Sequence, residues 1–231
     1  MNVEWWLVRH GLTSWNTERR YQGHSDLSLL PGEASGLTEL HRELEGVNFA
    51  AVFASDLRRC RETLAWARPD LLNSVQYDPR LREMNFGLWE GQTYEMLKED
   101  ERYHTWIDDP QAVTPPGGES WEAFRLRVSE VCRELLECTG TAEGRVPGSP
   151  GWSSAVPTKP PSLEATPLPS TSGQEPLRLL IVTHGGVISM LSSLLQPGLG
   201  FWDTRVGPGG IQRLIIQGEG ESEEEKEGDN D

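Results

Sequence analysis

Two short segments of the same design lie far apart in this chain and limit what it can fold into. Residues 7–11 read Leu-Val-Arg-His-Gly, and residues 181–186 read Ile-Val-Thr-His-Gly-Gly. In each segment an apolar run typical of a buried strand ends at a histidine followed by glycine. Open α/β folds bind their ligands at the carboxyl ends of parallel strands. The two segments therefore predict that His10 and His184 meet at one edge of a sheet.

The residues around His10 suit a phosphate group. A neutral imidazole can attack a phosphoryl group near neutral pH without a separate base to deprotonate it. Arg9 can hold phosphate oxygens with its guanidinium fork. Gly11 lets the backbone pass close to a bound anion, and the Asn16 carboxamide can donate further hydrogen bonds. Taken alone, Arg-His-Gly is also compatible with an ordinary turn at the end of a strand.

A longer stretch around these residues carries a family resemblance. Residues 7–16, Leu-Val-Arg-His-Gly-Leu-Thr-Ser-Trp-Asn, resemble the signature of the histidine phosphatase superfamily, the group that includes the phosphoglycerate mutases. The remaining family pattern falls into register over residues 3–137 and 177–216. The resemblance implies an α/β fold, a three-layer sandwich with a mostly parallel central sheet flanked by helices, as in phosphoglycerate mutase. It also implies that His10 is the nucleophile and that Arg9, Asn16, Gln22 and Gly23 bind the substrate phosphate.

A second block, residues 53–63, takes an apolar strand into a helix that begins with several arginines. Helix N-termini favour anions, and arginine adds full charge. The resemblance implies that Arg59 is the phosphate ligand, whereas Arg58 and Arg61 are expected to face solvent. Ser55 or Asp56 is expected to cap the helix.

A third block, residues 80–91, resembles the family segment that holds the acid/base carboxylate, and Glu83 occupies that position. Cleavage of a phosphomonoester requires a proton for the leaving oxygen and later a base for water, and one glutamate can serve both steps. Glu83 should then be protonated when substrate is bound. Glu90 is the rival carboxylate, and we expect it to brace the loop instead.

The last block supplies His184 and Gly185, which the resemblance places at the same phosphate. His184 is expected to donate a hydrogen bond to the phosphoryl oxygens as a cation while charge shifts during transfer. Two histidines and two arginines around one phosphate can supply the charge that a magnesium ion supplies elsewhere. The predicted site therefore uses no metal ion and no cofactor.

Composition divides the chain into one domain and two low-complexity segments. Residues 1–218 are expected to form the enzyme domain, interrupted at residues 139–176 by a disordered insertion that holds half of the 16 prolines. Residues 219–231 hold eight acidic residues and one lysine and are expected to form a disordered acidic tail. The insertion lies between a long helix and the strand that delivers His184, so we interpret it as an enlarged surface connection.

Charge and cysteine content limit the binding partners and the cellular compartment that we expect for this protein. A net charge of −15 and a pI near 4.8 argue against nucleic acid, because no basic stripe is present to replace phosphate counterions. No membrane span and no signal peptide are expected. Three cysteines without paired spacing fit a reducing compartment, so we expect a cytoplasmic protein that acts on a small phosphorylated metabolite. A homodimer is possible and is left open by the sequence.

The apolar pattern also predicts the elements that carry these residues. Trp5 and Trp6 are expected on opposite faces of the sheet, and the loop at residues 115–120 is expected to border the mouth of the pocket. Strands are expected at residues 3–8, 51–54, 177–183 and 211–216, and helices at 31–44, 56–67, 93–100, 120–137 and 186–195.

The overall interpretation is a metal-independent phosphomonoester hydrolase that works through a phosphohistidine on His10. Hydrolysis is favoured over a mutase reaction because a low-complexity insertion stands where mutases carry structured segments. Three blocks look most like the α-ribazole phosphatase branch, which acts late in cobalamin assembly. The alternatives are a broad-specificity or sugar-bisphosphate phosphatase, a phosphoglycerate mutase-type phosphotransferase, and a non-catalytic phosphate-binding scaffold.

Overall fold

The computed structural model describes residues 2–139 and 176–217. Almost all of the predicted insertion at 139–176, and the whole predicted tail at 219–231, lie outside the described residues.

A five-stranded sheet in the order β3-β2-β4-β1-β5 forms the centre of the molecule. Strands β3, β2, β4 and β1 run parallel, and β5 pairs with β1 in the antiparallel direction. The sheet is therefore mostly parallel, as predicted. The strand bounds are Asn2–Arg9 (β1), Ala51–Ala54 (β2), Val75–Tyr77 (β3), Leu177–Thr183 (β4) and Ile211–Gln217 (β5).

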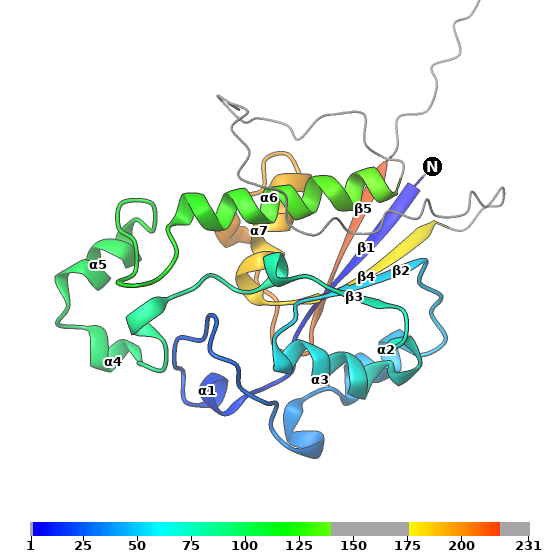
Figure 1. Ribbon diagram of the computed structural model, residues 1–231, viewed down its shortest axis with the longest axis horizontal. Coiled ribbons are helices and arrows are strands. Elements are labelled where there is room, and N and C mark those ends of the chain that lie inside the picture. The colour runs from blue at the N-terminus through cyan, green and yellow to red at the C-terminus, as the bar shows by residue number, and fades with distance from the viewer. Residues whose placement is uncertain (1, 140–175, 218–231) are drawn as a thin grey trace, which may run out of the picture.

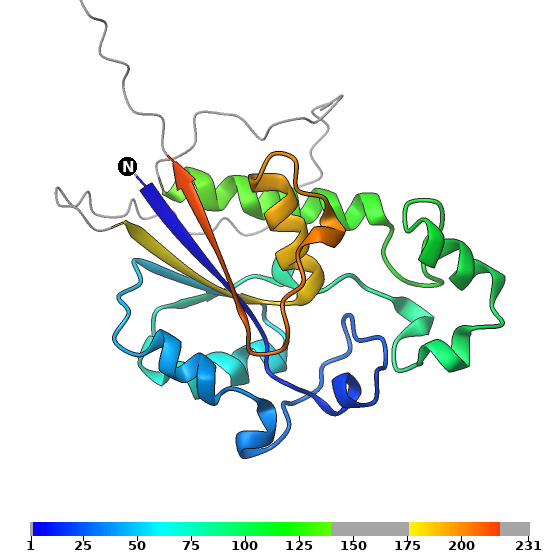
Figure 2. The same ribbon diagram turned by 180° about the vertical axis from the view of Figure 1, so that it is seen from behind.

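Helices cover both faces of this sheet, which gives the three layers expected for the fold (Figure 1). Helices α6 and α7 lie on one face and α2 and α3 on the other, and the reverse view shows the same separation (Figure 2). The helix bounds are Ser14–Thr17 (α1), Thr38–Leu44 (α2), Arg58–Ala67 (α3), Tyr94–Leu97 (α4), Glu101–Asp108 (α5), Trp121–Cys138 (α6) and Gly185–Leu195 (α7).

Alternation along the strands produces two separate apolar cores, one on each face. Trp5 packs in the core under α6 and α7, whereas Trp6 packs in the core under α2 and α3. This confirms the predicted placement of the two tryptophans, because successive side chains of a strand point to opposite faces. Leu179 and Leu180 divide in the same way on β4. The strands are thus buried on both sides, as parallel sheets are.

The structure corrects several predicted elements. The helix predicted at 31–44 is divided into a 3-10 turn, Gly32–Ser35, and α2, because Gly36 between them has a φ of +73° that ends the first turn. The helix predicted at 93–100 is the shorter α4, and α5, which was not predicted, follows it, where the Asp100 side chain accepts hydrogen bonds from two backbone N–H groups and caps the helix. Strand β3 was not predicted; it has three residues and only one neighbouring strand.

Candidate active site

Strand register brings the sequence-predicted histidines together at one edge of the sheet. Arg9 at the end of β1 pairs with Thr183 at the end of β4. The chain leaves both strands side by side, and the His10 N–H donates to the Thr183 carbonyl at 3.0 Å. The imidazole rings of His10 and His184 lie with their centroids 5.1 Å apart. One phosphate-sized anion can therefore contact both rings.

His10 is buried, and its ring is held in one orientation. The Nδ1 atom lies 2.7 Å from the carbonyl oxygen of its neighbour Gly11, so Nδ1 carries the proton and donates it to that acceptor. The other nitrogen, Nε2, then keeps its lone pair. Burial, together with the positive charges of Arg59 and Arg9, holds the pKa of His10 well below its usual range. The ring is therefore neutral near neutral pH, which is the nucleophilic form.

His184 is fully buried between Arg59 and Ser55. Its Nδ1 accepts from the Arg59 guanidinium at 3.1 and 3.3 Å, and its Nε2 lies 2.9 Å from the Ser55 hydroxyl. Burial first, and then the charge of Arg59, hold the pKa of His184 well below its usual range. The predicted cationic His184 concerns the site with phosphate bound and stays a prediction, whereas in the protein by itself the neutral ring is favoured. A dianionic phosphate placed beside the ring would favour the cation, because an opposite charge lowers its cost.

Arg59 is completely buried, whereas Arg58 and Arg61 are exposed, as predicted for the three arginines of α3. Besides His184, the Arg59 guanidinium donates to the carbonyls of Ser25 at 2.8 Å and Gly23 at 2.7 Å. No carboxylate is paired with it in these hydrogen bonds. A buried cation held only by neutral groups is prepared to receive an anion.

The predicted cap of α3 is wrong. The helix begins at Arg58 with Leu57 as its N-cap, and the Arg58 backbone N–H donates to the carboxylate of Asp26, from a different segment, at 2.6 Å. Ser55 is directed to His184 instead, and the Asp56 carboxylate is paired with Arg82 at 2.5 and 2.7 Å. Both side chains are therefore engaged in tertiary contacts that a local capping rule does not anticipate.

Arg9 and Gly185 lie against one another at the mouth of this cluster. Arg9 donates from Nη1 to the Val206 carbonyl at 2.8 Å, while its buried Nε has no hydrogen-bond partner among the described residues. A Cβ at Gly185 would come within 3.3 Å of the Arg9 Cζ atom. The glycine therefore leaves room for the guanidinium beside the N-terminus of α7, where anions are favoured.

Asn16 and Gln22 are both oriented by Thr13. The Asn16 Oδ1 accepts from the backbone N–H of Thr13 at 3.0 Å, which leaves Nδ2 as the group able to donate. The Gln22 Oε1 accepts from the Thr13 hydroxyl at 2.8 Å, and its buried Nε2 has no partner within the described part of the chain. Gly23 differs from these two, because its carbonyl holds Arg59 and its Cα lies too close to Met84 for a side chain.

Glu83 lies against the N-terminus of α7. Its Oε2 accepts from the backbone N–H of Gly186 at 2.9 Å, and its Oε1 accepts from the N–H of Met84 at 2.9 Å. A Cβ at Gly186 would lie only 2.3 Å from the Glu83 Oε1. The second glycine of the His-Gly-Gly segment is thus required by the carboxylate, a role that the sequence analysis did not assign.

Glu90 binds the loop that holds Arg59. Its carboxylate accepts from the backbone N–H groups of His24 at 2.8 Å and Ser25 at 2.7 Å, and from the Ser25 hydroxyl. These bonds fix the loop whose carbonyls hold Arg59. The expected bracing role of Glu90 agrees with these contacts.

A cavity of about 800 Å³ opens from Arg9, Glu83 and the start of α7 toward α5. Nearly half of the residues that line it are aromatic. This lining was not identified from the sequence, although the count of nine tryptophans was a signal that could have prompted it. Within it the hydroxyls of Tyr21 and Tyr103 are hydrogen-bonded at 2.8 Å. The aromatic lining residues are Tyr21, Phe86, Tyr94, Tyr103, Trp106, Trp121, Phe124, Phe201 and Trp202.

The loop at residues 115–120 is absent from this lining, contrary to the expectation that it borders the pocket mouth. It packs on the segment after Glu83 instead, where the Leu88 N–H donates to Pro116 at 2.8 Å and the Glu119 N–H donates to Asn85 at 2.8 Å. Trp121, the first residue of α6, and Phe124 after it reach the cavity.

Metal-binding clusters and membrane-spanning helices are both absent from the described residues. Within residues 2–139 and 176–217, no three His, Cys, Asp or Glu side chains gather where they could hold a metal ion. In the same part of the chain, no helix combines the length and the apolar character that a bilayer crossing needs.

Comparison with known proteins places this geometry in a family. Residues 5–144 match the model of the histidine phosphatase superfamily (branch 1). The chain is 30% identical over 208 residues to the adenosylcobalamin/alpha-ribazole phosphatase of Escherichia coli K12, covering 88% of this chain and 85% of that protein. It is also 31% identical to an Erwinia tasmaniensis protein named "Probable phosphoglycerate mutase GpmB", covering 82% and 73%.

A solved structure gives the same result for the fold. The alpha-ribazole phosphatase from Shigella flexneri superimposes with a TM-score of 0.69 at 27% identity, covering 91% of this chain and 89% of that one. The sheet order, the two histidines and the matched sequence blocks agree with one another. The chain belongs to the histidine phosphatase superfamily, branch 1.

Proposed function

We propose that this protein hydrolyses a phosphomonoester through a phosphohistidine formed on His10. The observation that carries the proposal is the pairing of the His10 and His184 rings, 5.1 Å apart at the ends of two adjacent parallel strands. Arg9, Asn16, Gln22, Gly23, Arg59 and Gly185 are proposed to surround the phosphate. Glu83 is proposed as the acid and base.

In the first step the Nε2 lone pair of neutral His10 attacks phosphorus, and the bond from phosphorus to the ester oxygen breaks. Glu83 gives its proton to the leaving oxygen, so that an alcohol departs. The hydrogen bond from Nδ1 to the Gly11 carbonyl stabilises the positive charge that develops on the ring. Arg9 and Arg59 stabilise the charge on the transferred phosphoryl oxygens.

In the second step Glu83, now a carboxylate, accepts a proton from water as the water oxygen attacks the phosphohistidine. The bond from nitrogen to phosphorus breaks, its electron pair returns to Nε2, and inorganic phosphate leaves. Glu83 regains its proton, and the site is restored. The Gly186 N–H keeps the carboxylate at one place through both steps.

For the substrate we propose α-ribazole 5′-phosphate, the compound after which several relatives are named. α-Ribazole is a ribonucleoside whose base is a substituted benzimidazole, an aromatic bicycle. The cavity beside Arg9 and Glu83 is walled by aromatic rings, which bind aromatic bases by stacking and edge contacts. A 5′-phosphate at His10 would direct the base into this cavity. A broad-specificity phosphatase and a mutase are the alternatives that the test must separate.

The test combines trapping with a substrate panel. A rapid quench with labelled substrate should yield an acid-labile phosphoenzyme in the wild type and none in His10→Ala, with His41→Ala, an exposed histidine remote from the site, as the matched control. The panel contains α-ribazole 5′-phosphate, a sugar bisphosphate, 3-phosphoglycerate and p-nitrophenyl phosphate. Each is assayed with and without a chelator.

We expect the highest kcat/KM with α-ribazole 5′-phosphate and no effect of the chelator. Equal rates across the panel would favour a broad-specificity phosphatase, and interconversion of phosphoglycerates would favour a mutase. Dependence on a divalent metal would contradict the proposed mechanism. Phosphate binding without turnover of any ester would leave only the scaffold interpretation.

A further inference from the structure

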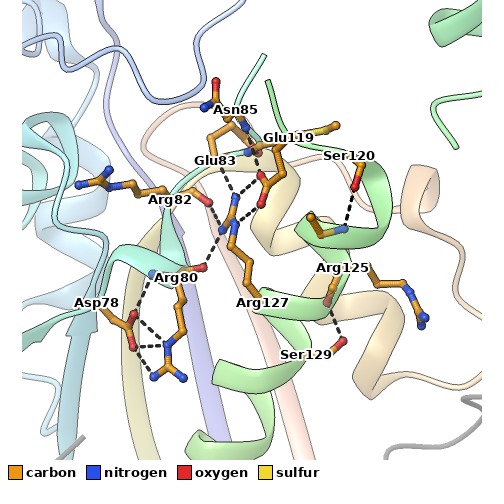
Figure 3. Close-up of polar contacts among 12 residues, drawn as sticks. Asp78, Arg80, Arg82, Glu83, Asn85, Glu119, Ser120, Arg125, Arg127 and Ser129 are labelled. Atoms are coloured by element: carbon orange, nitrogen blue, oxygen red, sulfur yellow. Dashed lines mark hydrogen bonds and ion pairs between the residues drawn. The ribbon is translucent and has the colours of Figure 1, made fainter. Parts of the chain in front are cut away.

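Arg127, in the second turn of the long helix α6, is placed behind the segment that carries Glu83 (Figure 3). Its guanidinium makes five hydrogen bonds. Two go to the Glu119 carboxylate at 2.6 and 2.8 Å. The other three go to the backbone carbonyls of Arg80 and Arg82, both at 2.7 Å, and of Glu83 at 2.8 Å.

This arrangement uses the whole donor capacity of the side chain. A guanidinium has five N–H groups in a fixed plane, and five bonds of good length are formed here. A lysine has three donors on a flexible stem and cannot reproduce the pattern. Such a match between donor geometry and a run of carbonyls fixes the position of a backbone segment as well as stabilising it.

Glu119 completes the support from the other side of Glu83. It forms a partly buried ion pair with Arg127, the two side chains being 13% and 16% exposed. Its Oε2 also accepts from the Asn85 N–H at 3.2 Å, and its own N–H donates to the Asn85 carbonyl at 2.8 Å. The segment is therefore held before, at and after Glu83. The Glu83 carboxylate, bound to the Gly186 and Met84 N–H groups, extends from this held segment into the site.

We propose that the Arg127–Glu119 pair is a positioning device for the acid/base carboxylate, acting through the backbone at residues 80–85. This inference rests on the proposed role of Glu83. Arg127 touches neither phosphate nor leaving group. Its effect is to keep the Glu83 carboxyl within reach of the leaving oxygen, where an error of about 1 Å is costly.

The chain offers a matched control in Arg80. Its side chain ties the same loop to the same helix through Glu134, at 2.7 and 2.8 Å, and also pairs with Asp78. Arg80→Met therefore removes a partly buried ion pair of the same kind, yet leaves the carbonyl of Glu83 with its donor. Both Arg→Met variants should lose stability, because each leaves carboxylates without their partner.

The experiment measures kcat/KM for two esters of similar size on each preparation. Benzyl phosphate releases an alkoxide that needs a proton, whereas 2,4-dinitrophenyl phosphate releases a stable phenolate that does not. Because kcat/KM reports the steps up to release of the alcohol, the ratio of the two values measures acid catalysis. The ratio is also independent of the fraction of protein that is folded.

In Arg127→Met we expect the benzyl to dinitrophenyl ratio to fall at least about tenfold, a part of the factor that general acids contribute. Arg127→Lys, which keeps the charge and three donors, should fall between this variant and the wild type. Arg80→Met should stay within about twofold of the wild-type ratio, because the Arg80 side chain makes no bond to the Glu83 backbone and leaves the donors of Arg127 in place. Inhibition by inorganic phosphate should be unchanged in all three.

An unchanged ratio in Arg127→Met, or the same fall in Arg80→Met, would overturn the inference while leaving the proposed function intact. A wild-type protein that forms no phosphoenzyme and hydrolyses neither ester would refute the proposed function, and the inference with it.

Discussion

Gly186→Ala is a sharp test of where the Glu83 carboxyl must lie. A methyl group at residue 186 would lie 2.3 Å from the Glu83 Oε1 and 3.1 Å from its Cδ, whereas ordinary contacts begin near 3.4 Å. The carboxyl must therefore retreat by about 1 Å. It moves cheaply, because it is the free end of a flexible side chain. Its hydrogen bond with the Gly186 N–H, 2.9 Å long, is then lost or lengthened.

Gly186→Ala should change the stability of the protein little but lower its catalytic rate strongly. Gly186 is the second residue of α7, and alanine is favoured over glycine in a helix by up to about 1 kcal/mol. This gain partly offsets the weakened hydrogen bond, so the free energy of unfolding should change little. Displacement of a catalytic group by about 1 Å costs roughly a factor of 10² in rate. This corresponds to about 2.7 kcal/mol of transition-state stabilisation.

Urea unfolding and kcat/KM for benzyl phosphate measure the two quantities on the same protein. Ser193→Ala serves as the control, because the Ser193 hydroxyl bonds only within α7, to the Met190 carbonyl at 2.8 Å and weakly to the Met190 sulfur. Glu83→Asp, which shortens the side chain, should lose less activity on addition of Gly186→Ala than the wild type does. A Gly186→Ala protein with full kcat/KM would refute the assignment of Glu83 as an acid that acts from this position.

Three further predictions concern charge and specificity. Burial holds the pKa of His184 in the folded protein below the value near 6.5 that the unfolded chain has. As the pH falls below about 6.5, the unfolded chain therefore takes up a proton at His184 before the folded protein does, and the folded protein loses stability. His184→Gln should therefore reduce the slope of the unfolding free energy against pH by up to about 1.4 kcal/mol per pH unit between about pH 6.5 and 5.5. Urea titrations at several pH values measure this slope, and an unchanged slope would contradict the lowered pKa of His184. The buried Nε2 group of Gln22 has no hydrogen-bond partner among the described residues, and Gln22→Glu replaces it with an anionic oxygen. Inorganic phosphate should therefore inhibit this variant about tenfold more weakly than the wild type. Unaltered inhibition would exclude Gln22 from the phosphate site. Trp202 is 59% exposed and lines the cavity. Trp202→Ala should raise the KM for α-ribazole 5′-phosphate by about threefold to tenfold, because an aromatic contact with the substrate is lost. An equal rise in the KM for methyl phosphate would show that the cavity wall does not select aromatic substrates.

The local sequence determined the family, the mostly parallel sheet and the strand-end placement of His10 and His184. Each of these depends on residues adjacent in the chain: an apolar run long enough for a buried strand, then a histidine and a glycine. Arg59 could also be separated from Arg58 and Arg61 by the family pattern, and its complete burial agrees with that choice. These features are readable because periodicity and motif spacing are properties of short segments.

Tertiary structure alone decided how those groups are charged, held and enclosed. His184 is neutral because of the burial and the arginine charge that the folded chain gathers around it. Glu83 is held by Gly186, 103 positions away, and its backbone by Arg127, 44 positions away. The aromatic cavity joins residues from Tyr21 to Trp202. Burial and hydrogen bonding between segments so far apart are set by packing in three dimensions, and no local pattern encodes them.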